Sequence, residues 1–252
     1  MRVLVSVSDP AEARTALDAG ADVIDAKDPR AGALGAVSMD TLHAIHAVVN
    51  GVCPVSVALG DAVDEHEVED AARRAALPGS AFVKLAFGGR PTHQRVMSLI
   101  HAARRGVGNE IAPRCLVVAA AYADWDATGF GPSPASVIDA AARAGAAGVL
   151  IDTADKHGPG LLGCATGETL HGWVEAAHAA GLWIALAGRL REQDLVAVSV
   201  LGADIVGVRG AVCEGGRTGR VSAGRIHRVM AQARGMAEAR FGATHSGRCQ
   251  PR

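Results

Sequence analysis

Short apolar runs alternate with amphipathic stretches along most of this chain. Eight apolar segments are predicted as buried strands, at residues 2–7, 22–27, 54–58, 81–86, 115–120, 148–152, 183–187 and 204–208. Ala-rich amphipathic stretches that favour helices follow them, near residues 9–19, 38–48, 65–77, 92–105, 133–143, 167–180, 191–199 and 222–233. Continuous apolar strands that alternate with helices are typical of a parallel sheet covered by helices.

The number of repeats predicts that the sheet closes. Eight strand–helix units with no spare element indicate a (β/α)8 TIM barrel, an α/β fold with a single domain over residues 1–234. The main alternative is an open doubly wound sheet, but no Gly-x-Gly-x-x-Gly motif follows the first strand. Residues 235–252 lack periodicity and are predicted as a flexible C-terminal tail.

Composition and charge exclude several classes of protein. The formal net charge is −1, and no basic cluster alternates with aromatic residues, so nucleic-acid binding is not expected. The chain opens directly with a strand-like segment and contains no run of about 18 apolar residues, which predicts a cytoplasmic protein without a membrane partner. The sequence leaves the oligomeric state open and allows a homo-oligomer. No serine-hydrolase or zincin motif occurs, and no metal is predicted.

Lysine is scarce, and its positions are informative. Of 25 lysine and arginine residues, only Lys27, Lys84 and Lys156 are lysines. Lys27 ends the second predicted strand, Lys84 lies near the end of the fourth, and Lys156 follows the sixth. Catalytic groups of such barrels come from the C-terminal ends of the strands, and side chains from alternate strands share an interior layer. The three amines are therefore expected at one mouth of the barrel.

Two aspartates are expected beside these amines. Asp25 shares a strand face with Lys27, Asp152 ends the sixth strand, and burying amines without carboxylates costs several kcal/mol. An amine in such a place either attacks a carbonyl as a neutral nucleophile, or stays charged to hold a phosphate or donate a proton. A structural ion pair at the rim is the alternative. The pattern alone does not rank Lys27 above Lys84.

The last two strands carry a different signal. Gly188 follows the seventh, Arg209 and Gly210 follow the eighth, and Gly215-Gly216-Arg217 comes next. Small residues let backbone N–H groups approach a phosphate, which barrels often bind after strands seven and eight. We therefore expect a phosphorylated substrate, with ordinary glycine turns as the alternative.

One further pair follows the fifth strand. Tyr122 is the single tyrosine, and Asp124 lies two residues after it. We interpret both as candidates for binding the substrate or orienting a proton at the mouth. Packing of the tyrosine ring is the alternative.

Together these residues resemble the (5-formylfuran-3-yl)methyl phosphate synthase family over about residues 1–230. The most specific segments are Asp-Val-Ile-Asp-Ala-Lys-Asp-Pro at 22–29, Gly-Ala-Leu-Gly-Ala at 32–36, Phe-Val-Lys at 82–84, Tyr-Ala-Asp at 122–124, Asp-Thr-Ala with Lys156 at 152–156, Ala-Leu-Ala-Gly at 185–188 and Val-Gly-Val-Arg-Gly-Ala at 206–211. Two departures are Ala121, where the family tends to have glycine, and His157, where it often has an acidic residue.

The resemblance implies a lyase that condenses two glyceraldehyde 3-phosphate molecules and expels phosphate and water. Lys27 would form the Schiff base, Lys84 would transfer protons, and Asp25, Asp152 and Lys156 would complete a charged cluster. The product, (5-formylfuran-3-yl)methyl phosphate, would serve the biosynthesis of methanofuran-type one-carbon carriers. No cofactor is implied. A class I aldolase or phosphosugar isomerase, and a non-enzymatic barrel that binds pyridoxal phosphate, are the competing hypotheses.

Overall fold

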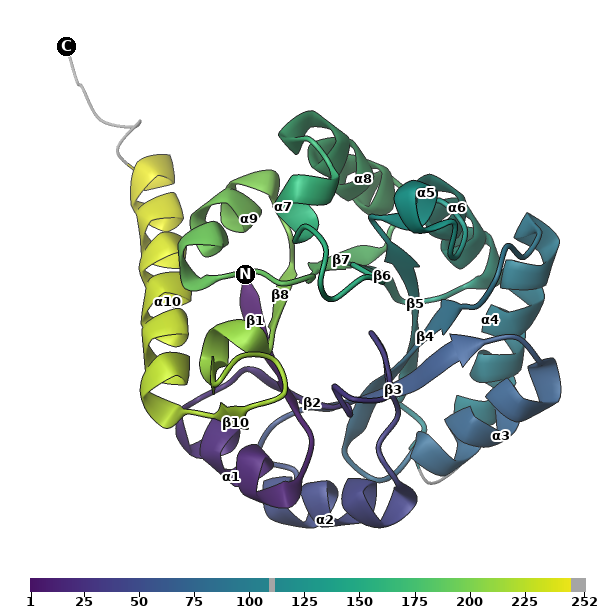
Figure 1. Cartoon of the computed structure of the whole chain (residues 1–252), viewed down its shortest axis with the longest axis horizontal. Helices are drawn as coiled ribbons and strands as arrows, with labels where there is room; N and C mark the ends of the chain where they lie inside the picture. The colour runs from purple at the N-terminus through teal and green to yellow at the C-terminus, as the bar shows by residue number, and fades with distance from the viewer. Residues whose placement is uncertain (109–111, 246–252) are drawn as a thin grey trace.

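The computed structural model describes residues 1–108 and 112–245, giving the backbone alone for 237–245. Within those residues, eight parallel strands close into a barrel in chain order, with β8 paired to β1 (Figure 1). The strands are β1 (Arg2–Val7), β2 (Val23–Ala26), β3 (Val55–Ala62), β4 (Ser80–Phe87), β5 (Leu116–Tyr122), β6 (Gly148–Asp152), β7 (Trp183–Leu186) and β8 (Ile205–Val208). The predicted (β/α)8 barrel is confirmed, and the open doubly wound sheet is excluded.

Helices cover the outside of the barrel. The main ones are α1 (Pro10–Asp18), α2 (Met39–Val49), α3 (Glu65–Ala75), α4 (His93–Val107), α6 (Pro134–Ala144), α8 (Gly167–Ala179), α9 (Leu195–Leu201) and α10 (Ala223–His245). Polar side chains such as Asp9 and Ser38 accept hydrogen bonds from the first turns of α1 and α2, which stabilises helix starts. After α6 and α9, Gly145 (φ +72°) and Gly202 (φ +93°) adopt the left-handed conformation that ends a helix.

The prediction of no spare element is wrong at the C-terminal mouth. The connections after β5 to β8 contain additional short elements: α5 (Trp125–Thr128), α7 (Leu161–Cys164), the 3₁₀ helices η1 (Glu192–Asp194) and η2 (Gly210–Val212), and a small hairpin of β9 (Cys213–Glu214) and β10 (Arg220–Val221). Elements of two to four residues are too short for a hydrophobic period to reveal them.

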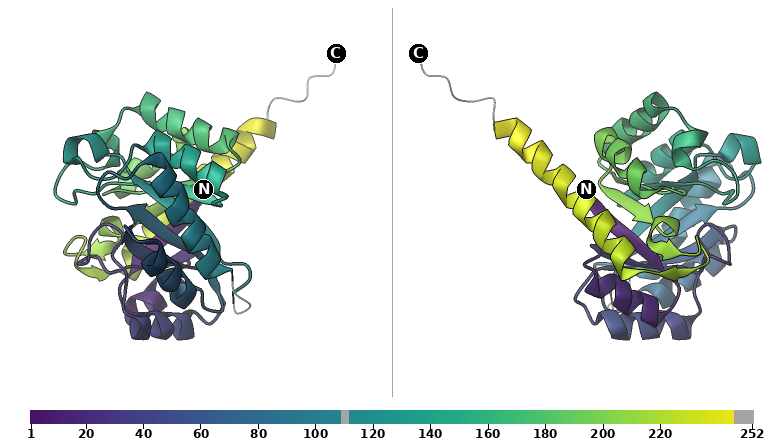
Figure 2. Two further views of the ribbon diagram at one scale, coloured as in Figure 1. Left: turned by 90° about the vertical axis from the view of Figure 1, so that its right-hand side faces the viewer. Right: turned by 60° about the vertical axis from the view of Figure 1, so that its left-hand side comes forward.

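The last helix corrects the predicted start of the tail. α10 continues to His245, past residue 235, and Figure 2 shows its C-terminal part extending beyond the barrel. Residues 236–243 are mostly helix formers, whereas the expectation of a tail depended on the missing apolar period. An apolar period indicates a face that packs on a core, so its absence does not exclude a helix. The remainder of the predicted tail, residues 246–252, lies outside the described residues.

Alternation along the strands separates two apolar regions. Outward-facing strand residues pack against the helices, whereas the inward-facing cluster contains Leu4, Phe82, Val118, Leu150 and several alanines. Small inward side chains leave space inside the barrel, which is where a cavity lies. None of the helices in residues 1–108 and 112–245 is long and apolar enough to cross a membrane.

Candidate active site

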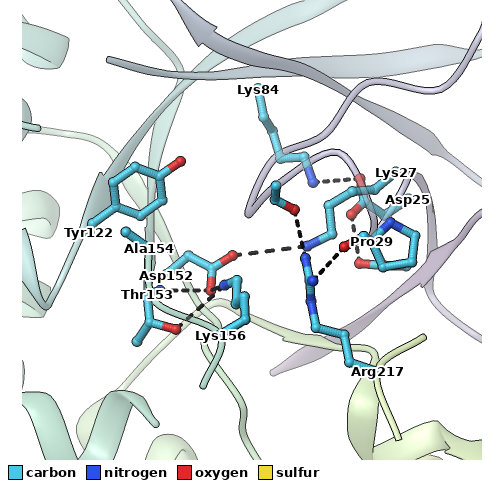
Figure 3. A network of polar contacts seen from close by, with 12 residues as sticks. Asp25, Lys27, Pro29, Lys84, Tyr122, Asp152, Thr153, Ala154, Lys156 and Arg217 are labelled. Carbon is cyan, nitrogen blue, oxygen red and sulfur yellow. Dashed lines mark hydrogen bonds and ion pairs between the residues drawn. The ribbon is translucent and has the colours of Figure 1, made fainter. Parts of the chain in front are cut away.

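Five charged side chains converge at the C-terminal mouth of the barrel (Figure 3). They are Asp25, Lys27, Lys84, Asp152 and Lys156, and all five line one cavity of about 570 Å³. Asp25, Lys84 and Asp152 are at most 2% exposed, and Lys27 is 8% exposed. The structure therefore brings together every residue that the sequence suggested as catalytic. The period-2 alternation of β2 points Asp25 inward, and Lys27 follows on the same side.

Asp25 is held on both of its oxygens. Oδ1 accepts hydrogen bonds from Lys84 Nζ at 2.5 Å and Ser56 Oγ at 2.7 Å, and Oδ2 accepts one from Ser6 Oγ at 2.8 Å. Burial raises the pKa of Asp25, but the charges of Lys84 and Lys27 outweigh burial, so the pKa lies below its ordinary value. Asp25 is thus a buried carboxylate with its charge compensated.

Asp152 is held on one oxygen. Oδ1 accepts hydrogen bonds from Lys156 Nζ at 2.7 Å and the Thr153 N–H at 2.8 Å. Oδ2 lies 3.9 Å from Lys27 Nζ and accepts no hydrogen bond from the described residues. Burial raises the pKa of Asp152, but Lys156 and Lys27 outweigh it and leave the pKa lowered. Asp152 therefore presents an ionised oxygen to the cavity.

The three amines are not equivalent. Lys84 donates a hydrogen bond to Asp25, and Lys156 donates one to Asp152. Burial, aided by the positive charge of Lys27, lowers the pKa of each of these two lysines, although their aspartates oppose the change. Within the described residues Lys27 Nζ has only the 3.9 Å contact with Asp152. Lys27 thus carries the amine that is most available to a carbonyl.

The wall of the same cavity also contains the glycines after β7 and β8. Gly188 and Gly210 both line the cavity, as predicted for a phosphate-binding wall. Gly188 has φ +109°, and a Cβ there would lie 2.9 Å from Thr153 Cγ2, so a side chain would not fit. Deeper in the barrel, the rings of Phe82 and Trp183 meet edge to face with centroids 5.2 Å apart and form an apolar wall.

Comparison with known proteins assigns the family. The family model for 4-HFC-P synthase matches residues 3–230. The chain belongs to this family. It is 38% identical over 237 residues to (5-formylfuran-3-yl)methyl phosphate synthase of Methanopyrus kandleri, covering 94% of this chain and 99% of the relative. It is 36% identical over 231 residues to the synthase of the same name from Methanocaldococcus jannaschii, covering 91% and 96%. The predicted family, and with it an enzyme, is confirmed.

Solved structures support the barrel fold of this 4-HFC-P synthase family member. Phosphoribosyl anthranilate isomerase from Thermus thermophilus has a TM-score of 0.60 at 15% identity, covering 94% of this chain and 100% of that one. Thiamine phosphate pyrophosphorylase from Pyrococcus furiosus has a TM-score of 0.61 at 16% identity, covering 93% and 96%. At such identities the similarity concerns the fold alone.

Arg209, a predicted substrate-binding residue, lines the cavity, but its guanidinium is occupied by protein partners. Its NH1 donates to Ser6 O (3.0 Å) and Glu12 Oε2 (2.6 Å), and its NH2 to Glu12 Oε1 (3.2 Å) and Gly219 O (3.1 Å). Its Nε donates to the carbonyl of Arg217 at 2.9 Å. All five N–H groups are bound within the protein. Arg209 therefore joins β1, α1 and the hairpin structurally, and the sequence reveals nothing of the buried partner Glu12.

Tyr122 and Asp124 likewise have protein partners, and neither lines the cavity. Asp124 accepts hydrogen bonds from the N–H groups of Ala154 at 2.7 Å and Asp155 at 2.8 Å, so it braces the loop that carries Lys156. Tyr122 donates a hydrogen bond to Asp61 Oδ1 at 2.6 Å. Burial, followed by the charge of Asp61, raises the pKa of Tyr122. This geometry gives no support to direct substrate contacts by Tyr122 or Asp124.

Three further residues belong to the site without having been assigned from sequence. Ser6 and Ser56 bind Asp25, and Arg217 reaches into the cavity from the β9–β10 hairpin. A serine at an inward position of an apolar strand is a usable signal, because a buried hydroxyl needs a partner. In the described part of the chain, no three or more His, Cys, Asp or Glu side chains are arranged to hold a metal ion.

Proposed function

We propose that this chain is a (5-formylfuran-3-yl)methyl phosphate synthase that forms its product from two molecules of glyceraldehyde 3-phosphate through a Schiff base on Lys27. The observation that carries the proposal is the arrangement around Lys27. Its buried amine has no hydrogen bond within the described residues, and it lies in a cavity with two aspartates, each bonded to another lysine.

Lys27 supplies the nucleophile. Its amine attacks the aldehyde of one triose phosphate, water leaves, and the resulting iminium draws electrons from the adjacent carbon. Loss of a proton from that carbon gives an enamine, which supplies the carbon nucleophile that joins the two trioses. Lysine chemistry of this kind requires no metal, because the protonated imine is itself the electron sink.

Asp152 and Lys84 are suited to the proton transfers. Asp152 Oδ2 carries a negative charge, accepts no hydrogen bond from the described residues and lies 3.9 Å from the Lys27 amine. It can take a proton next to the imine and return it to a leaving hydroxyl. The lowered pKa of Lys84, caused by burial and the Lys27 charge, makes its ammonium a stronger acid.

The atoms of the overall reaction balance when phosphate and water are eliminated. One carbon–carbon bond forms between two three-carbon units, one phosphate leaves, and two waters are lost as the ring closes and becomes aromatic. Aromaticity makes the sequence effectively irreversible, and the retained phosphate remains on the hydroxymethyl carbon. We propose that the Gly188 and Gly210 wall binds one substrate phosphate through backbone N–H groups.

The proposal also specifies what the product is used for, where the reaction takes place and what the protein binds. The product would supply methanofuran-type one-carbon carriers, in the cytoplasm, with a phosphorylated triose as the partner and neither nucleic acid nor a membrane. No cofactor takes part. A homo-oligomer is compatible with this function.

One incubation tests the function. Purified protein given glyceraldehyde 3-phosphate should produce an ultraviolet-absorbing furan aldehyde and one released phosphate per furan. A class I aldolase or an isomerase would release no phosphate, and a barrel carrying pyridoxal phosphate would be yellow as purified. Intact, folded protein that forms no furan would overturn the proposal.

A further inference from the structure

Arg217 enters the active-site cavity from the hairpin that follows β8. Its NH1 donates to Pro29 O at 2.5 Å (Figure 3). Its NH2 donates to Gly32 O at 2.6 Å. These carbonyls belong to the loop directly after Lys27. The half-buried guanidinium is therefore held in one place, at the edge of the cavity that contains the lysines.

No acidic side chain of the described residues is in direct contact with Arg217, although the charges of Asp152 and Asp28 act on it from farther away. Arg217 forms no ion pair within 4.0 Å among residues 1–108 and 112–245, where Arg209 pairs with Glu12 and Arg191 with Asp194. Two carbonyl dipoles compensate a cation only in part. Burial lowers the pKa of Arg217, and Arg217 in turn adds to the lowering of the pKa of Lys156, so the two cations share one region of the cavity.

The cavity as a whole has an excess of positive charge. Basic side chains outnumber acidic ones among the residues that line it, and each of the two buried aspartates is already bonded to a lysine. A fixed cation that forms no direct ion pair among the described residues, next to a second cation, is suited to bind a polyanion. The wall of Gly188 and Gly210 comes from the loops after β7 and β8, whereas Arg217 is anchored to the loop after β2.

We propose that Arg217 binds the phosphate group of the second triose substrate. This inference rests on the proposed function, because a condensation of two phosphorylated substrates needs two phosphate positions in one cavity. The amides near Gly188 and Gly210 hold one phosphate, and Arg217 holds the other while it fixes the loop after Lys27. A guanidinium suits both tasks, because its planar set of donors can bind carbonyls and phosphate oxygens together.

The test is a calorimetric titration of the full-length protein with inorganic phosphate. The wild type should bind two phosphates per chain, and Arg217→Gln should lose one of them, with an affinity loss on the order of tenfold or more. Arg217→Lys should keep both with a smaller loss, because the charge remains. Arg220→Gln is the matched control: it removes an exposed arginine of the same hairpin that does not line this cavity, and it should bind as the wild type does.

Two results of the titration would contradict the proposal. Two phosphates bound by Arg217→Gln with wild-type affinity would overturn the proposal. Equal loss in Arg217→Gln and Arg217→Lys, with equal falls in Tm, would assign Arg217 to loop anchoring alone and also overturn it. Should the wild type make no furan while Arg217→Gln still loses a phosphate, the proposed function fails and the anion site stands.

Rate measurements provide a second readout. Arg217→Gln should raise KM for glyceraldehyde 3-phosphate more than it lowers kcat. Borohydride should still trap the first triose on Lys27 at the wild-type level, because that step needs one substrate only. Loss of trapping in a folded Arg217→Gln protein would contradict the assignment to the second triose.

Discussion

The two buried aspartates at the barrel mouth have the same charge and similar burial but different bonding. Asp25 is held on both oxygens by Lys84, Ser56 and Ser6, whereas Asp152 is held on Oδ1 and leaves Oδ2 without a hydrogen bond from the described residues. The closed arrangement around Asp25 fixes a charge in place. In the proposed mechanism the open oxygen of Asp152 exchanges the proton. Burial and charge do not distinguish the two aspartates, whereas the number of lone pairs that accept hydrogen bonds does.

The largest effect is expected at the amine between the two aspartates. Lys27→Arg should fold normally and form no detectable furan, because a guanidinium stays charged and cannot form an imine. Furan absorbance and mass spectrometry after borohydride reduction measure both steps. A borohydride adduct of normal yield in Lys27→Arg would instead assign the nucleophile to Lys84. The reacting amine would then be the one bonded to Asp25.

The closed site should be more important for stability. Asp25→Asn leaves the Lys84 ammonium buried beside a neutral amide, so the free energy of unfolding should fall by about 3–5 kcal/mol. Urea denaturation measures this loss. Asp152→Asn is the matched variant, and its loss should be clearly smaller because the Lys156 side chain is more exposed than that of Lys84, at 12% against 3%. Equal losses would mean that the two aspartates are structurally alike.

The open site should be more important for proton transfer. Asp152→Asn should lower kcat by roughly 10²–10⁴-fold, the range typical of a lost acid–base group, while Lys27 still forms a trapped adduct. Steady-state furan formation and adduct yield, measured on the same preparation, separate the two effects. An unchanged kcat would assign the proton transfers to another group.

Acid should weaken both sites in a predictable direction. The pKa values of Asp25 and Asp152 are lowered from 3.8, since the lysines outweigh burial. The unfolded chain therefore binds more protons than the folded one as the pH falls from about 4. Their contribution to the free energy of unfolding is complete above that pH and is lost as the pH falls through the folded pKa values. Urea titrations between pH 7 and pH 3 should show a shallower loss in Asp25→Asn than in the wild type.

The smallest effect is expected at Tyr122, next to Asp152 in the barrel register. Tyr122→Phe removes the hydrogen bond to Asp61 and should cost about 1–2 kcal/mol of stability, with kcat changed by less than about threefold. Thermal unfolding and furan formation measure the two quantities. A large fall in kcat with unchanged stability would show that the open site includes Tyr122.

Most of the architecture could be predicted because it depends on local patterns. Strand and helix positions agree with the apolar periods to within a few residues for most elements, and inward placement of Asp25 and Lys27 follows from alternation. The exceptions have physical reasons. β3 extends to Ala62 through a register shift, and α10 continues beyond the barrel to His245.

The site was harder to predict where function depends on distant partners. Arg209 and Arg217 lie eight residues apart with the same chemistry in sequence, yet Arg209 is bound fully by Glu12 and backbone carbonyls. No local pattern distinguishes them. Gly188 could be selected from the sequence because a glycine just after a strand indicates either a turn or a close approach of the backbone to a ligand.

The sequence by itself determined the closed barrel, the mouth at which the chemistry lies, and the three lysines gathered there, because strand alternation and strand order fix those positions. Only the tertiary structure decided which lysine is free, which aspartate has an open oxygen and which arginine has all its N–H groups bound within the protein. Those properties depend on hydrogen bonds between residues far apart in the chain, such as Asp25 with Lys84 and Arg209 with Glu12, and such pairs form only when the barrel closes.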